Sequence, residues 1–462
     1  MKRLCCLLVL AGVAGLVSIS HADMTEQNRD LRRTPVVEAV EKVRASVVNI
    51  STERMVTVRW GFDPFFGDSD DVFDQMFRDF FGPRYAPGPV ERKKVELPLG
   101  SGCVITADGL VVTNEHVVRR ATNLKLSLYT GETFEAELLA ADPTEDLALL
   151  RAKAPHPLQS IPMGSSATMM LGETVLALGN PYGFENSVTS GIVSAFNREI
   201  ALGGRNNVKY TGLIQTSALI NPGNSGGPLV NVLGELVGIN TAVVDQAQGI
   251  GFSIPIDRAR EVLAPLLATP QVSEAWMGFK GETTETRDGV RITHIEEKSP
   301  AAKQLKEGDI IRRMDDVAVG DLFDLHLRIV QRKPGDEIAL ALDRGEEAVT
   351  VNIELGRMPA PTPKKILLAK FGLQGQDLTK ALVEQLGTAV DYGVLITEVD
   401  RDSVAEVAGL RRGDVIVQIG SNIIRDLKGA AVLLRNVRAG EQVYIRIVRG
   451  RYVAGGYIQV AE

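Results

Sequence analysis

Residue types that mark metal, redox and disulfide chemistry are scarce in this sequence. Its 462 residues include only three cysteines and five histidines, and the His-Glu-x-x-His pattern of zinc proteases does not occur. Because no cofactor-binding motif appears either, we expect neither a metal nor another cofactor. Positive charge is also in deficit, with 51 basic against 58 acidic side chains, which disfavours nucleic acid as the main partner.

The N-terminal apolar stretch is too short to span a membrane. It runs over Leu4–Val17, below the roughly 20 residues that a span needs, and it follows Lys2 and Arg3. Small residues come after it at the positions that a signal peptidase reads. This pattern predicts a signal peptide over residues 1–22, cleaved after Ala22. An uncleaved anchor is the alternative interpretation.

Cleavage would leave a single cysteine in the mature chain. Cys5 and Cys6 belong to the signal peptide, and because Cys103 then stands alone, an intrachain disulfide is impossible. Cys103 lies in an apolar run, where a small buried hydrophobe is far more common than a nucleophile. The content of 44% hydrophobic and 24% charged residues is that of a folded globular protein, and the length indicates about three domains.

Residues 23–268 are predicted to form one β-rich domain. Short apolar runs separated by turn residues follow one another to about Ile254, and Ala107-Asp108-Gly109 is typical of a hairpin turn. Closely spaced strands with few helical patterns favour an all-β barrel or a sandwich. A short helix over Ile256–Leu267 is expected to close the domain.

One segment of this domain is rich in aromatic residues. Nine of the chain's 24 aromatic side chains fall between Trp60 and Tyr85. Large exposed apolar patches usually mark interaction sites, so we interpret the segment as a site of interaction. A small satellite core packed beneath the loop is the alternative.

The chain repeats itself after residue 269. Three blocks recur at an offset of 104 to 105 residues, which predicts two copies of one small α+β domain, at 269–357 and 366–462. The proline-rich residues 358–365 indicate a stiff linker between the copies. The matched blocks are Asp288–Thr293 with Tyr392–Thr397, Glu307–Ile311 with Arg412–Ile416, and Pro334–Ile338 with Ala439–Val443.

The stretch Asn221–Leu229 holds Ser225 among three glycines, just before an apolar, strand-like run. Glycines reach backbone angles that other residues avoid, so such a turn can aim several N–H groups beside one hydroxyl. The oxyanion hole of an acyl-transfer enzyme needs this geometry. On these residues alone, a surface turn that happens to contain a serine is an equal alternative.

A serine nucleophile needs a histidine base and an acid that orients the base. His116 follows a predicted strand of the same domain, whereas the other histidines of the mature chain lie in a proline-rich loop or in the repeated modules. Asp146 precedes an apolar strand and is preferred as the acid, because Asp142 before a proline is typical of a turn. The order His116, Asp146, Ser225 is that of chymotrypsin-like proteases.

Together these motifs resemble the HtrA family of secreted serine proteases, and within it the Do-like (DegP/DegQ) branch with two PDZ domains. The resemblance implies a chymotrypsin-like, all-β double-barrel protease domain followed by two α+β PDZ domains. It also implies an ATP-independent endopeptidase of the periplasm that degrades misfolded or unfolded envelope proteins, with chaperone-like holding. Homotrimers that assemble into larger oligomers are implied as well. The motifs are Thr113–Val118, Asp146–Leu150, Gly223–Leu229 and Gly238–Thr241.

The resemblance assigns roles to individual residues of the protease domain. His116 would be the general base, Asp146 its orienter and Ser225 the nucleophile, with the backbone N–H groups of Gly223 and Ser225 as the oxyanion hole. Leu219, six residues before the serine, would line the specificity pocket. Since no acidic residue stands there, we expect cleavage after small aliphatic residues such as Val, Ala or Ile, and not after Lys or Arg.

The resemblance also assigns regulatory segments. The aromatic segment, within about residues 55–95, matches the family's regulatory loop, with Tyr182–Val188 and Val243–Gly249 as its switching partners. In the repeated modules, Met277-Gly278-Phe279 and Phe371-Gly372-Leu373 fall where PDZ domains capture the C-terminal carboxylate of a peptide, which then adds to the sheet as a strand.

The first module departs from the family pattern. It is about ten residues shorter than the second after the capture loop, and it has Lys303-Gln304-Leu305 where the second has Val407–Leu410. This difference puts peptide capture by the first copy in doubt.

Two functions from different classes fit the sequence. One is a serine endopeptidase whose PDZ domains bind substrate or activating peptides and help to control assembly. The other is a non-catalytic holding chaperone or scaffold with a vestigial protease site. The intact catalytic residues and their glycine frame favour the enzyme.

Overall fold

The computed structural model describes most of the chain downstream of residue 29. The described residues are 30–57, 92–119, 121, 123–142, 144–179, 187–201, 209–221, 223–243, 249–359, 362–388, 390–420, 422–434, 437, 439–450 and 452–461. The predicted signal peptide, the aromatic segment Trp60–Tyr85 and most of the switching loops Tyr182–Val188 and Val243–Gly249 lie outside these residues. No helix among the described residues is long and apolar enough to cross a membrane.

The chain divides into two compact units, one with the residues up to Leu139 and Ala148–Arg260, the other with Ala140–Leu147 and the residues from Glu261 onward. Helix α2 (Pro35–Val43) precedes the first unit's barrels and begins where Thr34 caps it and a proline takes the first turn. A single 3-10 turn (Arg44–Ser46) then leads into the first strand. The predicted all-β architecture is confirmed, and of its two alternatives the barrel is correct.

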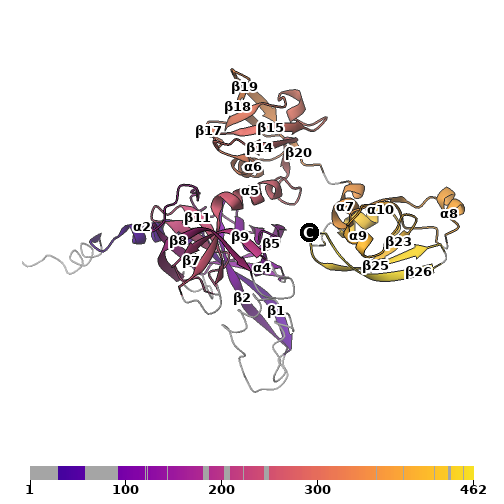
Figure 1. Ribbon diagram of the computed structural model, residues 1–462, viewed down its shortest axis with the longest axis horizontal. Coiled ribbons are helices and arrows are strands. Elements are labelled where there is room, and N and C mark those ends of the chain that lie inside the picture. Colours follow the sequence, from indigo (N-terminus) through magenta and orange to yellow (C-terminus); the bar gives the residue numbers. More distant parts are fainter. Residues whose placement is uncertain are drawn as a thin grey trace, which may run out of the picture. The chain divides into compact units, whose positions relative to one another are not determined.

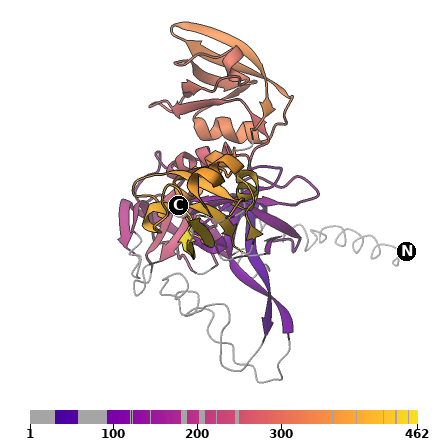
Figure 2. The same cartoon turned by 90° about the vertical axis from the view of Figure 1, so that its right-hand side faces the viewer.

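The first barrel is a closed six-stranded sheet in the order β1-β2-β3-β6-β5-β4. Beyond the barrel, β1 and β2 continue as a twisted two-stranded ribbon (Figures 1 and 2). The predicted hairpin is confirmed, since β2 and β3 pair with Cys103 opposite Val112. The strands are β1 (Val47–Thr57), β2 (Arg92–Val104), β3 (Leu110–Thr113), β4 (Leu124–Leu128), β5 (Thr133–Asp142) and β6 (Leu147–Ala152).

The second barrel repeats this closed topology in the order β10-β11-β12-β9-β8-β7. Strand β10 is buried at every residue, as is β3 of the first barrel. Helix α5 (Ile256–Leu267) follows the last strand over the residues predicted for it. The strands are β7 (Thr174–Gly179), β8 (Ser187–Ala201), β9 (Lys209–Thr216), β10 (Pro228–Asn231), β11 (Leu236–Val243) and β12 (Gly251–Pro255).

The second unit contains the two repeated modules, and their sheets confirm the duplication. The first is ordered β14-β15-β16-β18-β19 and the second β21-β22-β23-β25-β26, each with one short strand beside its third. The first module comprises β14 (Phe279–Thr283), β15 (Val290–Ile295), a 3-10 turn (Ala301–Lys303), β16 (Ile310–Met314), β17 (Val317–Ala318), α6 (Leu322–Val330), β18 (Glu337–Arg344) and β19 (Glu347–Glu354), with β13 (Ala275–Trp276) paired to β20 (Gly356–Arg357).

The second module has the same plan with different helices (Figure 1). Its apolar core holds side chains from helix α7, helix α10 and the inner face of the sheet. The elements are α7 (Pro363–Phe371), β21 (Leu373–Asp377), α8 (Lys380–Leu386), β22 (Val394–Val399), α9 (Val404–Val407), β23 (Val415–Ile419), β24 (Asn422–Ile423), α10 (Leu427–Leu434), β25 (Gln442–Arg449) and β26 (Tyr452–Gln459).

The residues that the first module lacks form helix α8 in the second. Leu382 and Val383 of this helix pack on Leu395, Val415 and Val448, in a cluster separate from the core beneath α10. The first module therefore lacks this cover on the outer face of its sheet. In the second module, the residues of α8 do not belong to the core that contains Phe371 and Leu373 of the capture loop, so their absence from the first module leaves the corresponding core intact.

Both modules contain, at the same offset, an ion pair between a buried aspartate and a partly exposed arginine. Arg344 donates to Asp309 at 2.7 Å, and it also donates to the carbonyl of Gln304. Arg449 donates to Asp414 at 2.7 Å in the second module. Burial opposes ionisation of Asp309, yet hydrogen bonds from Arg344 and from the Lys306 backbone hold the pKa of its carboxyl below the usual value.

We expect Arg344→Met to destabilise the first module by about 3 kcal/mol at neutral pH, because it leaves a buried carboxylate unpaired. Since the folded pKa of Asp309 is depressed, the pair's contribution is present above the unfolded pKa near 4 and is lost as the pH falls further. Urea unfolding at pH 7 and pH 3 measures both effects. Arg357→Met, which breaks an ion pair exposed on both sides, should cost less than about 1 kcal/mol. Equal losses for the two variants would contradict the prediction.

Candidate active site

Ser225 lies in a tight, buried turn immediately before strand β10, with 1% of its surface exposed. Gly223 and Gly226 have φ angles of 109° and 80°, values that favour glycine. Backbone hydrogen bonds close the turn on itself, from the Gly227 N–H to the Asn224 carbonyl at 2.9 Å, and tie it to β11, from the Gly226 N–H to the Asn240 carbonyl at 2.8 Å. The predicted glycine-framed turn is therefore a fixed part of the barrel.

The serine turn is also docked on the first barrel. The Ser101 N–H of β2 donates to the Ser225 carbonyl at 2.8 Å, and the Ser101 hydroxyl donates to the Gly223 carbonyl. The backbones approach so closely that a Cβ at Gly226 would overlap the Thr113 hydroxyl and the Ser101 carbonyl. The serine is therefore held against the end of strand β3.

His116 follows that same strand. It lies on a single-turn helix, α4 (Glu115–Val118), directly after β3. Val117, the next residue, reaches within 2.9 Å of a Cβ placed at Gly100, which would lie equally close to the Ser225 carbonyl. Only the backbone of Gly100 therefore fits between the serine turn and the segment that carries His116.

Asp146 is 1% exposed and has a φ of 54°, a left-handed conformation that residues with a Cβ rarely adopt. It precedes β6, which pairs with β3 so that Ala148 stands opposite Thr113. Because the two strands are antiparallel, Asp146 and His116 leave this pair at the same end. Asp142 instead accepts backbone N–H groups from Thr144 and Glu145 at 2.9 and 3.0 Å, which is the turn chemistry predicted for it.

The Ser225 hydroxyl donates to the Thr241 carbonyl at 3.3 Å in this structure. The ring atom Nε2 of His116 is buried and makes no hydrogen bond with the described residues, although the residue has other interactions. The serine side chain thus points toward β11. A rotation about its Cα–Cβ bond would turn the hydroxyl away from the Thr241 carbonyl.

Leu219 is 51% exposed, as a residue that lines an open pocket would be. Its carbonyl accepts hydrogen bonds from the Thr189 hydroxyl at 2.7 Å and from the Asn224 side chain at 3.3 Å. Sequence reasoning missed both donors. Thr189 lies 30 residues away on β8, and no local pattern marks such a contact, whereas the Asn224 side chain stands beside the serine and was assigned no role.

The remaining histidines and the cysteine have other environments. A hydrogen bond to Glu132 raises the pKa of His156, and burial lowers the pKa of His326, which contacts the Ala264 carbonyl. Burial also raises the pKa of the Cys103 thiol to about 12, so it stays protonated and is no nucleophile. No group of acidic, histidine or cysteine side chains in the described ranges could hold a metal ion.

The two predicted peptide-capture loops have matching backbones. Gly278 and Gly372 both have positive φ angles, 84° and 65°. The carbonyl of each accepts an N–H from the residue that directly follows the second strand after it, at 2.9 Å from Glu296 after β15 and at 2.8 Å from Asp400 after β22. The flanking Met277, Phe371 and Leu373 are buried, while Phe279 contacts the ring of His326.

Comparison with known proteins assigns the class of protein first. The model of the trypsin-like peptidase domain matches residues 100–239, and models of the PDZ domain match residues 276–355 and 395–449. The chain is therefore a serine endopeptidase with a trypsin-like domain followed by two PDZ domains.

Individual relatives then define the family. The chain is 33% identical, over 93% of its length and 94% of the relative's, to a probable periplasmic serine endoprotease DegP-like of Halomonas elongata. It is 32% identical to the periplasmic serine endoprotease DegP of Escherichia coli K12, over 92% and 94%. A solved structure of the HtrA-type protease AlgWS227A with a decapeptide is 33% identical in sequence to this chain. The match covers 71% of this chain and 99% of that one, with a TM-score of 0.41. The chain belongs to the DegP/HtrA family of periplasmic serine endoproteases.

We expect Gly226→Ala to destabilise the protease domain by about 3 kcal/mol or more, because a Cβ there overlaps Thr113 and Ser101 in addition to the cost of a positive φ. Gly131→Ala is the matched control. Its φ of 84° is similar, but nothing lies within 4 Å of the new Cβ, so the cost should stay near 1 kcal/mol. Urea unfolding compares the two, and the prediction is wrong if both variants lose the same stability.

Proposed function

We propose that Ser225 is the nucleophile of this endopeptidase, His116 its general base and Asp146 the acid that orients the base. The observation that carries this proposal is the docking of the serine turn on β2 and on the end of β3, the strand that leads into His116. The pairing of Thr113 with Ala148 supports the position of the acid.

The mechanism follows from these roles. The Ser225 hydroxyl turns from the Thr241 carbonyl to His116, which takes its proton as the oxygen attacks the scissile carbonyl carbon. The N–H groups of Gly223 and Ser225 stabilise the oxyanion of the tetrahedral intermediate. His116 then gives the proton to the leaving amine, and water hydrolyses the acyl-enzyme by the same steps in reverse. Asp146 keeps the imidazole ring in the required tautomer.

The substrates that we propose are misfolded or unfolded envelope proteins, degraded without ATP. The relatives are periplasmic, and an N-terminal segment with the features of a cleaved signal peptide would bring this chain to the same compartment. The capture loops at Met277–Phe279 and Phe371–Leu373 would bind C-terminal peptides. Holding of substrates and assembly of homotrimers into larger oligomers belong to the same proposal.

The proposed domain limits remain those derived from the sequence. The signal peptide would end at residue 22 and the protease domain at 268, with its regulatory loop at about 55–95. The PDZ domains would occupy 269–357 and 366–462, joined by the linker 358–365. The matches to the family models lie within these limits.

Ser225→Ala should abolish degradation of casein, because loss of the nucleophile costs on the order of 10⁶-fold in turnover. Ser194→Ala, at an exposed serine of β8, is the matched control and should retain full activity. Release of acid-soluble peptides measures both. Casein degradation that persists in Ser225→Ala, after contaminating proteases are excluded, would show that another group carries the chemistry and would leave the holding chaperone as the better function.

Cleavage after Val, Ala or Ile should dominate in a peptide library, because Leu219 offers no charge to a basic side chain. Leu219→Asp should shift the preference toward Lys and Arg, and the exposed position tolerates the change. Mass spectrometry of the products identifies the cleaved bonds. A wild-type cleavage profile dominated by Lys or Arg would contradict the assignment of Leu219 to the specificity pocket.

A further inference from the structure

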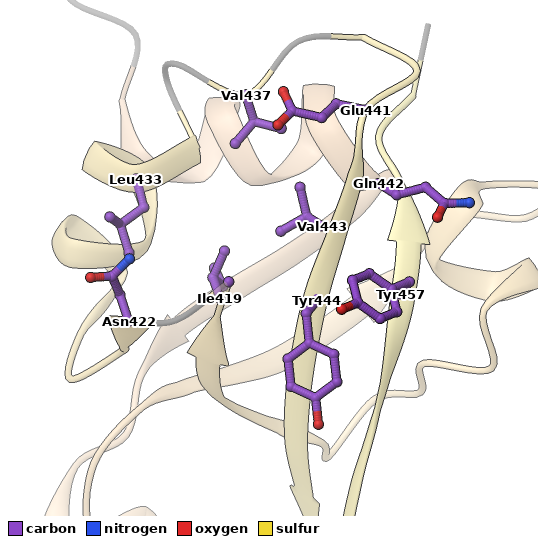
Figure 3. Close-up of a pocket in the computed structure, with 10 residues that line it drawn as sticks. Ile419, Asn422, Leu433, Val437, Glu441, Gln442, Val443, Tyr444 and Tyr457 are labelled. Carbon is purple, nitrogen blue, oxygen red and sulfur yellow. The ribbon is translucent and has the colours of Figure 1, made fainter. Parts of the chain in front are cut away.

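The second PDZ domain contains an open pocket that the proposed function does not use (Figure 3). Its volume is about 620 Å³, within the usual range for binding sites of small molecules or side chains. Its apolar lining residues include Ile419 and Val443 of the domain core, Leu433 of α10, and Val437 after the end of that helix. It is lined by β23–β25, β26 and the end of α10, and no residue of the capture loop Phe371–Leu373 belongs to the lining.

The first PDZ domain carries an exposed ion pair at the equivalent place. At an offset of 105 residues, Gly420 corresponds to Asp315 and Val437 to Arg332. Arg332 and Asp315 form an ion pair at 2.6 Å, and Asp315 also accepts the N–H of Ala339 at 3.0 Å. In the second domain a glycine and a valine replace these charged side chains, and both of them line the pocket.

The backbone at this place is the same in the two domains. The N–H of Asp315 donates to the carbonyl of Ala339 at 2.7 Å, and that of Gly420 donates to the carbonyl of Tyr444 at 2.7 Å. The φ angles of Asp315 and Gly420 are 52° and 57°. At this place the two domains therefore share a backbone conformation and differ in their side chains.

The two domains also differ at the rim of the pocket, where the second domain has two aromatic side chains and the first has none at the corresponding positions. Tyr444 pairs across the strands with Tyr457, where the first domain pairs Ala339 with Asn352. The two tyrosine rings meet edge to face with their centroids 5.4 Å apart. Aromatic side chains with a hydroxyl offer both apolar area and hydrogen bonds, which suits a surface that binds other polypeptides.

The charge of the lining selects the kind of ligand. Glu441 is the one charged side chain among the described lining residues, and Asn422 and Gln442 are neutral hydrogen-bonding groups. Two cations border the pocket without lining it, since Lys370 donates to the Val437 carbonyl and Arg446 lies over the Tyr444 ring. Within the lining itself, an anionic ligand would meet only the like charge of Glu441. An uncharged apolar side chain flanked by peptide groups meets an apolar floor and a polar rim.

An open strand edge lies next to the pocket. In the described part of the chain, β26 pairs only with β25, and six consecutive residues from Tyr452 to Tyr457 are exposed. An unpaired edge offers backbone N–H and C=O groups to an extended segment, and side-chain pockets beside it give specificity. Tyr457 belongs both to this edge and to the pocket.

We propose that this pocket binds an internal, extended segment of an unfolded polypeptide through one large apolar side chain, while the segment lies along β26. This inference rests on the proposed function, in which unfolded polypeptides are the substrates. It adds a holding site that needs no free C-terminus, distinct from the capture loop at Phe371–Leu373. The second domain would thus hold a substrate by its middle.

The test uses the full-length protein with Ser225→Ala, so that binding is measured without cleavage. The probe is a fluorescein-labelled 14-residue peptide of Ser, Thr and Gln with one central Phe, acetylated and amidated at its ends. Gly420→Asp with Val437→Arg rebuilds the ion pair of the first domain on a backbone that already accepts aspartate. Fluorescence anisotropy should give about tenfold weaker binding for this double variant, as expected when an aromatic side chain loses its buried site.

The controls separate the pocket from its surroundings. Val407→Arg with Leu386→Asp adds the same two charges at exposed positions of the domain and should leave the affinity unchanged. Tyr457→Asn, at a position that is 72% exposed, should also weaken binding without affecting the fold. A probe with Ser in place of Phe should bind weakly to every variant.

Equal affinity of the parent and the double variant for the Phe probe would overturn the proposal. So would a change in particle mass by light scattering at unchanged probe affinity, because the occupant would then be a second copy of the chain. Cleavage of a short chromogenic peptide by the double variant with Ser225 intact should match the wild type. If wild type cleaves nothing, the proposed catalytic function fails, while the binding result stands by itself.

Discussion

The close approach of two backbones, at the serine turn and at the end of strand β3, is the constraint on which the protease domain depends. Ser101 of β2 binds the Gly223 and Ser225 carbonyls, and the glycines on both sides leave no room for a Cβ. One bond joins main-chain atoms of the two barrels, and the other runs from the Ser101 hydroxyl to a main-chain carbonyl. Side chains elsewhere in the cores can be exchanged for others of similar size, whereas this contact accepts almost no added volume.

The sequence allowed the fold and the candidate triad to be predicted because both depend on local or ordered patterns. Strand runs, hairpin turns and the repeat offset are readable along the chain, and the order of His116, Asp146 and Ser225 pointed to a single architecture. Contacts such as Thr189 with the Leu219 carbonyl were not predictable, since they join side chains whose neighbours are set only by barrel closure. The helix that carries His116 was missed because it is a single turn, too short for any periodicity to reveal.

A comparison of the two PDZ domains distinguishes the features set by their shared backbone from the features set by their side chains. The strand order, the capture-loop glycine and the Arg–Asp ion pair recur in both. The shorter connection of the first domain was predicted to affect its groove, but the extra residues of the second form α8 on the outer face of the sheet. At the pocket, Gly420, Val437 and two tyrosines stand where the first domain has Asp315, Arg332, Ala339 and Asn352. Sequence comparison shows these exchanges, but only the coordinates show that the second domain's residues line a pocket.

The hydrogen bond between Ser101 and the serine turn closes a long loop of chain, and this affects the order of folding. Ser101 and Gly223 are 122 residues apart, so their bond forms only after each barrel has its shape. Contacts of such separation form late, because the chain entropy of closing the loop must be overcome first. Under the assignment proposed above, a chain with one finished barrel would carry Ser225 without the assembled site. Proteolysis by such a chain would begin only once its own folding is complete.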